Sequence, residues 1–191
     1  MTPPESDLVT PLTGLEPLPL AHGKAAPVLV TREGNRVSDG YPFIETGAAR
    51  PNAGGYSLGL SEALAELAVA PGPLGVRLLP TDDARALAPV LSRVALVEVV
   101  FPGYRDGRGY STARILREDL GYTGPLRAVG DVLRDQLFLM LRCGFDEFAL
   151  KDQAPEQALE IARARFRTVY QSAADARRAA HQERLTGAVS A

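Results

Sequence analysis

The stretch "ALVEVVFPGYRDGRGYSTARILREDLG", residues 95–121, decides the fold of this 191-residue chain. Its first part, 95–102, is an apolar run rich in valine, which is typical of a strand buried on both faces of a sheet. Its last part, 110–121, begins with hydroxyl residues and ends at a glycine, the pattern of a helix with ordinary caps. A loop rich in glycine and arginine joins the two. The stretch therefore predicts a strand, a loop and a helix in succession.

The same succession recurs along the second half of the chain. Strands are predicted at 74–80, 95–102, 126–130 and 146–151, and helices at 81–94, 110–121, 131–144 and 155–171. Pro89 could kink or split the helix at 81–94. Strands that alternate with helices form a parallel sheet with right-handed crossovers. Four such βα units are too few to close an eight-stranded barrel. We therefore expect an α/β fold with an open sheet or a half-barrel, whose free edges a second copy or another partner could cover.

The N-terminal part predicts smaller elements. Residues 26–41 are typical of a short hairpin, residues 50–59 of a loop, and residues 62–70 of a short helix. In domain terms, we expect a disordered or loosely attached tail over 1–22, a single α/β domain over 23–171, and a polar tail over 172–191.

The composition excludes several classes of function. A net charge of −2 gives no general attraction to nucleic acid or to anionic membranes. One cysteine, Cys143, cannot form a disulfide framework or a four-cysteine iron–sulfur site, and we expect its thiol to be buried and inert. Two distant histidines, His22 and His181, give no expected metal site or Ser–His triad. With no apolar run of about 18 residues and no signal peptide, we expect a cytoplasmic protein.

Three predicted strands each carry one charged residue near the middle: Arg77, Glu98 and Arg127. If these strands are neighbours and the three side chains share a face, they form an Arg–Glu–Arg ladder across the sheet. Such a ladder is either a structural ion network or the polar part of a ligand pocket.

In parallel α/β sheets, ligands bind beyond the carboxyl ends of the strands. The loop at 103–111 lies at that end and combines flexible backbone with positive charge. Its candidate anion- or ligand-binding residues are Arg105, Gly107, Arg108, Gly109, Tyr110 and Ser111, together with Arg114 on the helix that follows. The target would be a small anion or an acidic side chain of a partner. Alternatively, the loop is a tight turn whose arginines bind backbone carbonyls.

The segment 130–136 follows the next predicted strand and adds further candidates. Asp131 could cap a helix or act in catalysis, and Arg134 could hold an anion. Asp106, Asp131 and Asp135 are the candidate acid–base groups if the protein is an enzyme. Neither a P-loop nor a complete dinucleotide-binding fingerprint is present, so the sequence identifies no cofactor.

The segments "DGRGYSTARILREDLGYTGPLRAVGDVLRDQ" (106–136) and "RCGFDEF" (142–148) resemble the bacterial family called domain of unknown function 934. Members of this family carry the description of an oxidoreductase involved in sulfite reduction. The resemblance implies an accessory protein of assimilatory sulfite reduction toward cysteine, which acts with sulfite reductase or its electron donor. It implies no specific reaction, so enzymatic activity stays open. The alternative is a small α/β enzyme that binds an anionic metabolite or a phosphate-bearing cofactor through the loops.

Overall fold

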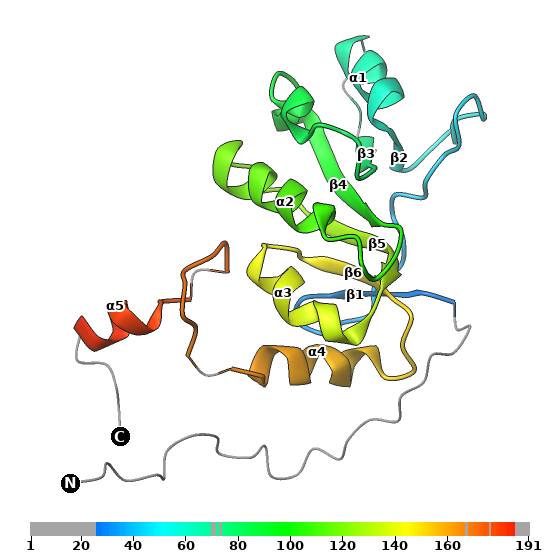
Figure 1. Ribbon diagram of the computed structural model, residues 1–191. Coiled ribbons are helices and arrows are strands. Elements are labelled where there is room, and N and C mark those ends of the chain that lie inside the picture. Colours follow the sequence, from blue (N-terminus) through cyan, green and yellow to red (C-terminus); the bar gives the residue numbers. More distant parts are fainter. Residues whose placement is uncertain (1–25, 70–71, 73, 167, 176, 186–191) are drawn as a thin grey trace, which may run out of the picture.

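The computed structural model describes residues 26–69, 72, 74–166, 168–175 and 177–185. The expected tail over 1–22 lies outside these residues. The fold is mixed α/β and is built on one six-stranded sheet with the strand order β1-β6-β5-β4-β3-β2 (Figure 1). The strands are β1 (Val28–Thr31), β2 (Tyr56–Gly59), β3 (Leu74–Leu78), β4 (Val94–Phe101), β5 (Leu126–Val132) and β6 (Glu147–Leu150).

The sheet is open, which is one of the two forms expected from the sequence. It is mixed rather than purely parallel. Strands β2 to β6 run parallel, while β1 pairs antiparallel with β6. The expected hairpin over 26–41 is not confirmed. A turn follows β1, but the return consists of an isolated bridge between Val30 and Arg36, because the chain then leaves the β1 edge and crosses the sheet.

The described residues form five α-helices: α1 (Leu60–Val69), α2 (Arg108–Arg114), α3 (Leu137–Arg142), α4 (Pro155–Ala164) and α5 (Ala180–Leu185). The last of these lies inside the expected polar tail. A π-helical turn, Ile115–Asp119, extends α2. The helix expected over 81–94 is wrong. Two 3₁₀ turns, Ala84–Leu87 and Leu91–Arg93, stand there instead, because Pro89 lacks an N–H and disfavours helical backbone at the residue before it.

The loop expected over 50–59 is wrong in its second half. Strand β2 forms there and pairs in parallel with β3. Its four residues, Tyr-Ser-Leu-Gly, hold too few apolar positions to indicate a buried strand, yet Ser57 and Leu58 are fully buried. The crossover helix α1 follows β2 and brings β3 back beside it (Figure 1).

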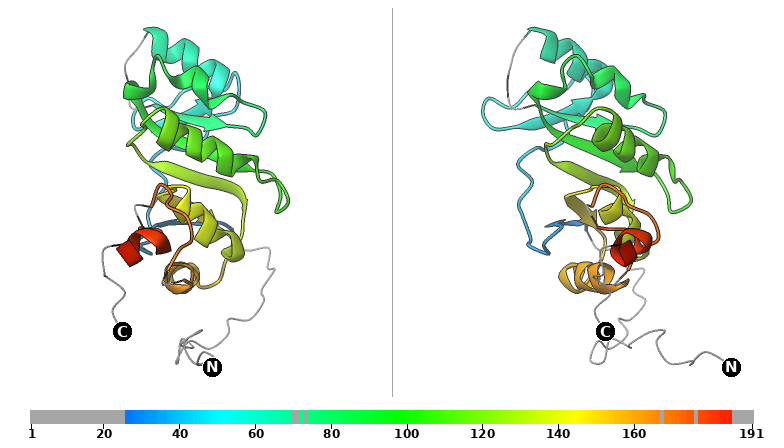
Figure 2. Two further views of the ribbon diagram at one scale, coloured as in Figure 1. Left: turned by 60° about the vertical axis from the view of Figure 1, so that its left-hand side comes forward. Right: turned by 90° about the vertical axis from the view of Figure 1, so that its left-hand side faces the viewer.

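Helices α1 to α4 lie on one face of the sheet (Figures 1 and 2). The hydrophobic core fills the space between them and the sheet, with Phe101, Phe145 and Phe148 among its largest fully buried side chains. Because side chains alternate along a strand, the residues next to these core positions point to the opposite face. We call that second face the open face.

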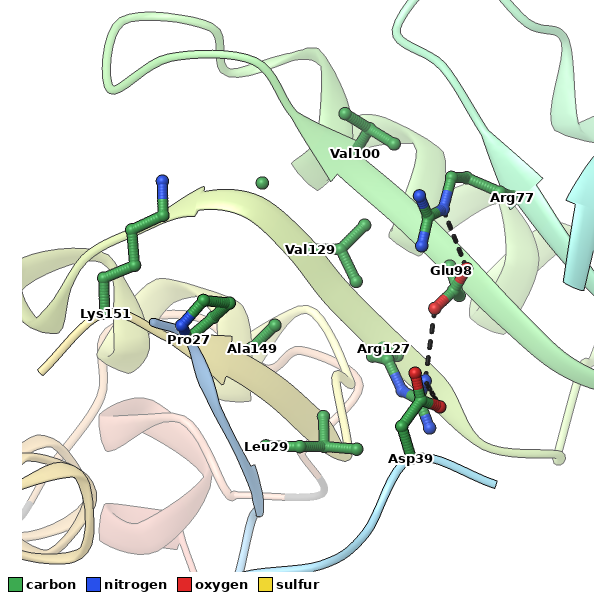
Figure 3. Close-up of a pocket in the computed structure, with 11 residues that line it drawn as sticks. Pro27, Leu29, Asp39, Arg77, Glu98, Val100, Arg127, Val129, Ala149 and Lys151 are labelled. Carbon is green, nitrogen blue, oxygen red and sulfur yellow. Dashed lines mark hydrogen bonds and ion pairs between the residues drawn. The ribbon is translucent and has the colours of Figure 1, made fainter. Parts of the chain in front are cut away.

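One segment, residues 36–45, crosses the open face, and we call it the strap. The chain must travel from the β1 edge to the β2 edge, a span of five strand spacings or about 24 Å. The strap ends beside β2, where Phe43 bridges to Ser57. It passes over the middle of the sheet, where Asp39 accepts a hydrogen bond from Arg127 (Figure 3).

No helix within the described parts of the chain is long and apolar enough to cross a membrane.

Candidate functional site

A row of charged side chains crosses the open face. The strand register places Arg77 beside Glu98, Glu98 beside Arg127, and Arg127 beside Glu147. The Arg–Glu–Arg ladder expected from the sequence is therefore present, and a second glutamate extends it. The four residues come from four adjacent strands, so their order follows directly from the strand order.

Glu98 is the centre of the ladder, and its side chain is only 1% exposed. One carboxylate oxygen accepts hydrogen bonds from the Ser57 hydroxyl at 2.7 Å and from Arg77 Nε at 2.8 Å, and the other accepts from Arg127 at 3.2 Å. A buried carboxylate is tolerable only when its oxygens are paired in this way. The ladder therefore fixes the relative positions of strands β2 to β5.

Arg127 is held by three carboxylates. It donates to Glu98, to Glu147 at 2.8 Å and to Asp39 of the strap at 2.8 Å. Burial alone would lower the pKa of this guanidinium, but the hydrogen bonds that it donates to Asp39 and Glu147 outweigh burial and raise the pKa. Arg127 thus stays charged, and its charge is neutralised within the protein.

Arg77 differs from Arg127 because only some of its N–H donors have partners. Its Nε binds Glu98, and its guanidinium lies over the Phe43 ring of the strap, 3.9 Å from the ring centroid. In the described residues its two terminal amino groups make no hydrogen bond, and its side chain is 25% exposed. The strap and the ladder therefore orient a cation that still has donors to offer.

A cavity of about 460 Å³ lies on the open face beside the ladder (Figure 3). Its volume is within the usual range of small-molecule sites. Arg77, Glu98, Arg127 and Asp39 line one end, Lys151 lines the other, and apolar residues form the floor between them. The floor residues are Pro27, Leu29, Val100, Val129, Gly130 and Ala149.

The loop that the sequence singled out, 103–111, lies elsewhere and is organised mainly by internal contacts. Asp106 accepts from the backbone N–H and the side chain of Arg108, with the closest contact at 2.6 Å. These hydrogen bonds hold the pKa of Asp106 below its ordinary value. Gly109 packs against the Phe101 ring, where a Cβ atom would approach to 2.6 Å. Tyr110 contacts the same ring edge-on, and burial raises its pKa.

Two of the other candidate arginines also have carboxylate partners within the protein. Arg114 pairs with Glu118 at 2.7 Å, one turn along the chain. Arg134 pairs with the buried Asp152 at 2.8 Å. The structure therefore does not bring the candidate arginines onto one shared anion site, and none of the candidates lines the open-face cavity.

The two other candidate carboxylates are also separate. Asp131 lies within β5 and faces Lys151 at 3.9 Å. Its expected role as a helix cap is wrong, since the Gln136 side chain accepts the N–H of Leu133 there. Asp135 is exposed on the 3₁₀ turn Arg134–Gln136, and Ser111 is exposed on α2.

The tip of the loop does present free side chains. Tyr104 is 58% exposed. Arg105 is exposed and has no hydrogen bond or ion pair within the described residues. Gln136 reaches the carbonyl of Tyr104 at 3.5 Å, which ties the loop to the next strand connection. The loop is therefore an anchored projection with an aromatic and a cationic side chain at its tip.

Much of the motif that carries the family resemblance is structural. Arg117 donates to the carbonyls of Tyr122, Gly124 and Gly144 and pairs with Asp146, and its side chain is 13% exposed. Asp146 in turn accepts the backbone N–H of Leu126 at 3.0 Å. This one arginine joins the end of the π-helical turn to the beginnings of β5 and β6. Sequence reasoning missed it, although "LREDLGY" and "RCGFD" hold the contacts.

Sequence reasoning also missed Asp39 and Lys151, which lie in segments without a recognisable motif. Cys143 stands at the end of α3, where burial raises the pKa of its thiol. Among the described residues, no group of three or more His, Cys, Asp or Glu side chains is placed to hold a metal ion.

The comparison with protein families gives a match over the second half of the chain. The model of a family described as a bacterial protein of unknown function (DUF934) matches residues 75–181, which is more than half of the chain. The match covers β4, β5, β6 and all the loop candidates, while β1, the strap and β2 precede it. No curated protein matches the chain.

Proposed function

The chain belongs to the DUF934 family of bacterial proteins of unknown function, and we propose that it is an accessory protein of assimilatory sulfite reduction. In this role it docks onto sulfite reductase or its electron donor in the cytoplasm. The pathway follows from the resemblance of the loop and helix motifs. The docking role rests on the geometry of the loop 103–111.

The observation that carries the docking role is the exposed tip of this loop. Tyr104 and Arg105 project from a backbone that Gln136 holds in place. Tyrosine and arginine are enriched among the residues that dominate binding energy at protein interfaces. Because Arg105 has no carboxylate partner among the described residues, an acidic patch on the partner would supply one.

Direct binding between the purified chain and the purified partner tests this role. Sulfite reductase and its electron donor are immobilised separately, and the dissociation constant of the full chain is measured at low salt. Tyr104→Ala with Arg105→Glu should weaken binding at least about tenfold, which corresponds to ~1.4 kcal/mol.

A matched control is available at the other end of β4. Arg93 is also an exposed arginine, but the length of the strand separates it from the loop by about 26 Å. Arg93→Glu changes the net charge as Arg105→Glu does, so it should leave docking unchanged. Equal loss of binding in both variants would indicate general electrostatics and would contradict docking by the loop.

The alternative proposal is a small α/β enzyme that binds an anionic metabolite or a phosphate-bearing cofactor. The local pairing of Arg108, Arg114 and Arg134 disfavours the loops as its binding site. The cavity on the open face favours a ligand there instead. The cavity is not lined by the candidate acid–base groups of such an enzyme, which are Asp106, Asp131 and Asp135.

A further inference from the structure

We propose that the open-face cavity binds an organic anion, a carboxylate or a sulfonate with an apolar body, whose charged group is held by Arg77. This site is separate from the docking loop, and the inference does not depend on the proposed partner. Both the shape of the site and its chemistry support it.

The apolar floor is the first argument. Leu29, Val100, Val129 and Ala149 come from four adjacent strands and point to the same face. All four stay partly exposed, whereas a neighbour of each on the helix side of the sheet, Val30, Phe101, Ala128 or Phe148, is buried. No layer of described residues covers this floor. Apolar surface of this kind gains free energy when an apolar group displaces water from it.

The free donors of Arg77 are the second argument. Glu98 takes only Nε, and Phe43 packs against one side of the guanidinium plane. The terminal amino groups are then left at the edge of the cavity with a fixed orientation (Figure 3). Arginine offers parallel N–H donors that match the oxygens of a carboxylate or a sulfonate.

Arg127 is not the anchor, although it lines the same cavity. Its side chain is 5% exposed and is shared among three carboxylates. Those carboxylates also repel an anion that approaches Arg127 directly. Lys151 lies at the far end of the floor, beyond Val129, and has a single contact of 3.9 Å with Asp131 (Figure 3). It could hold a second polar group of a longer ligand.

The floor and the anchor together restrict the ligand class. An inorganic anion such as sulfite would bind Arg77 but would leave the apolar floor exposed to water. A neutral apolar molecule would cover the floor but leave the arginine without a partner. Only a molecule with both parts uses the whole site.

The test is a titration of the full chain with small-molecule probes. Amide chemical shifts in two-dimensional NMR spectra report the binding. Four probes separate the two parts of the site: hexane-1-sulfonate, hexanoate, hexan-1-ol and sulfite. We expect one of the two organic anions to bind with a dissociation constant of about a millimolar or tighter. Hexan-1-ol and sulfite should bind at least about tenfold more weakly, and the shifts should centre on residues 98–100, 127–130 and 149–151.

Two cavity variants and one control variant locate the binding. Ala149→Phe places a ring on the floor, in a strand position that accepts aromatic residues, and should lower affinity at least about tenfold. Leu139→Phe is the control, because Leu139 is an exposed apolar residue on α3, on the other side of the sheet. Arg77→Gln should abolish the preference for hexane-1-sulfonate over hexan-1-ol.

Four results would overturn the proposal. They are no binding of either organic anion, sulfite binding as tightly as hexane-1-sulfonate, shifts that centre away from the cavity, and affinity unchanged by Ala149→Phe. If Arg77→Gln fails to fold, Ala149→Phe and the probe series still decide the outcome. Docking to a partner is measured with Tyr104 and Arg105 variants, so either idea can fail without the other.

Discussion

Replacement of Arg117 by leucine tests how the family motif holds the sheet. In the wild-type chain, Arg117 donates to Gly144 O at 3.0 and 2.9 Å, to Gly124 O at 2.8 Å and to Tyr122 O at 2.5 Å, and it pairs with Asp146. Leucine removes every one of these donors. Asp146 then keeps the N–H of Leu126 and a long contact with Arg32 at 3.5 Å.

The expected loss of stability follows from these contacts. Removal of one partner of a buried ion pair costs about 3–5 kcal/mol, because the other charge stays without compensation. Side chains of Arg117 and Asp146 are 13% and 30% exposed, so water recovers part of that cost. The three carbonyls that lose a donor add to it, at about 1 kcal/mol each where they remain buried. We expect the free energy of unfolding to fall by about 4 kcal/mol.

The assay is equilibrium unfolding in urea, with circular dichroism as the readout. Arg114→Leu is the control, because Arg114 lies three residues earlier in the same helical segment and pairs with Glu118 at the surface. Exposed pairs of this kind contribute about 0–1 kcal/mol, so this variant should unfold close to wild type. A loss below ~1 kcal/mol for Arg117→Leu would refute the view that this arginine joins α2 to β5 and β6.

Three other predictions follow from single sites. Gly130→Ala should lower the free energy of unfolding by at least about 2 kcal/mol. The φ of Gly130 is 98°, and an added Cβ atom would lie 2.3 Å from a backbone oxygen. Gly59→Ala is the control and should not destabilise the fold, because a Cβ atom at Gly59 would meet open space. NMR titration should show the Asp106 carboxyl ionising below its ordinary pKa, and Arg108→Ala should raise that pKa. Since the folded-state pKa is the lower one, the stabilisation by this pair is present above about pH 4 and is lost as pH falls through the folded-state value. Cys143 should react with iodoacetamide at pH 7.5 at least about tenfold more slowly than free cysteine, since burial raises its pKa, and unfolding in urea should abolish the difference.

Strands β3 to β6 of the parallel part could be predicted from the sequence because they are apolar runs with clear boundaries, whereas β2 could not. The ladder followed from the same pattern, since Arg77, Glu98 and Arg127 occupy equivalent positions in three such runs. The family resemblance seen in the loop and helix motifs was confirmed by the match over residues 75–181.

The partners of the arginines could not be predicted. A loop with several arginines indicates an anion site only if no nearby carboxylate of the protein forms ion pairs with them. Asp106 and Glu118 are close in sequence and take Arg108 and Arg114, but Asp152, which takes Arg134, is 18 residues away. Sequence spacing alone does not separate these cases from Arg105, which keeps its charge available.

The cavity could not be predicted either, because the strap and β1 create it. Strand β1 was expected to fold back on itself, and the segment after it was expected to be the return of a hairpin. Instead β1 joins the edge of the sheet, and the strap brings Asp39 to Arg127, 88 residues later in the chain. Such a long-range contact has no local signal in the sequence.

The growth of a deletion strain tests the proposed role in sulfite reduction most directly. The strain is grown with sulfite or with sulfide as the sole sulfur source and is complemented with wild type, with Arg93→Glu, or with the Tyr104→Ala and Arg105→Glu double variant. We expect the deletion strain to fail on sulfite and to grow on sulfide. Wild type and Arg93→Glu should rescue growth on sulfite, and the double variant should not. Equal growth of the uncomplemented strain on both sulfur sources would contradict it.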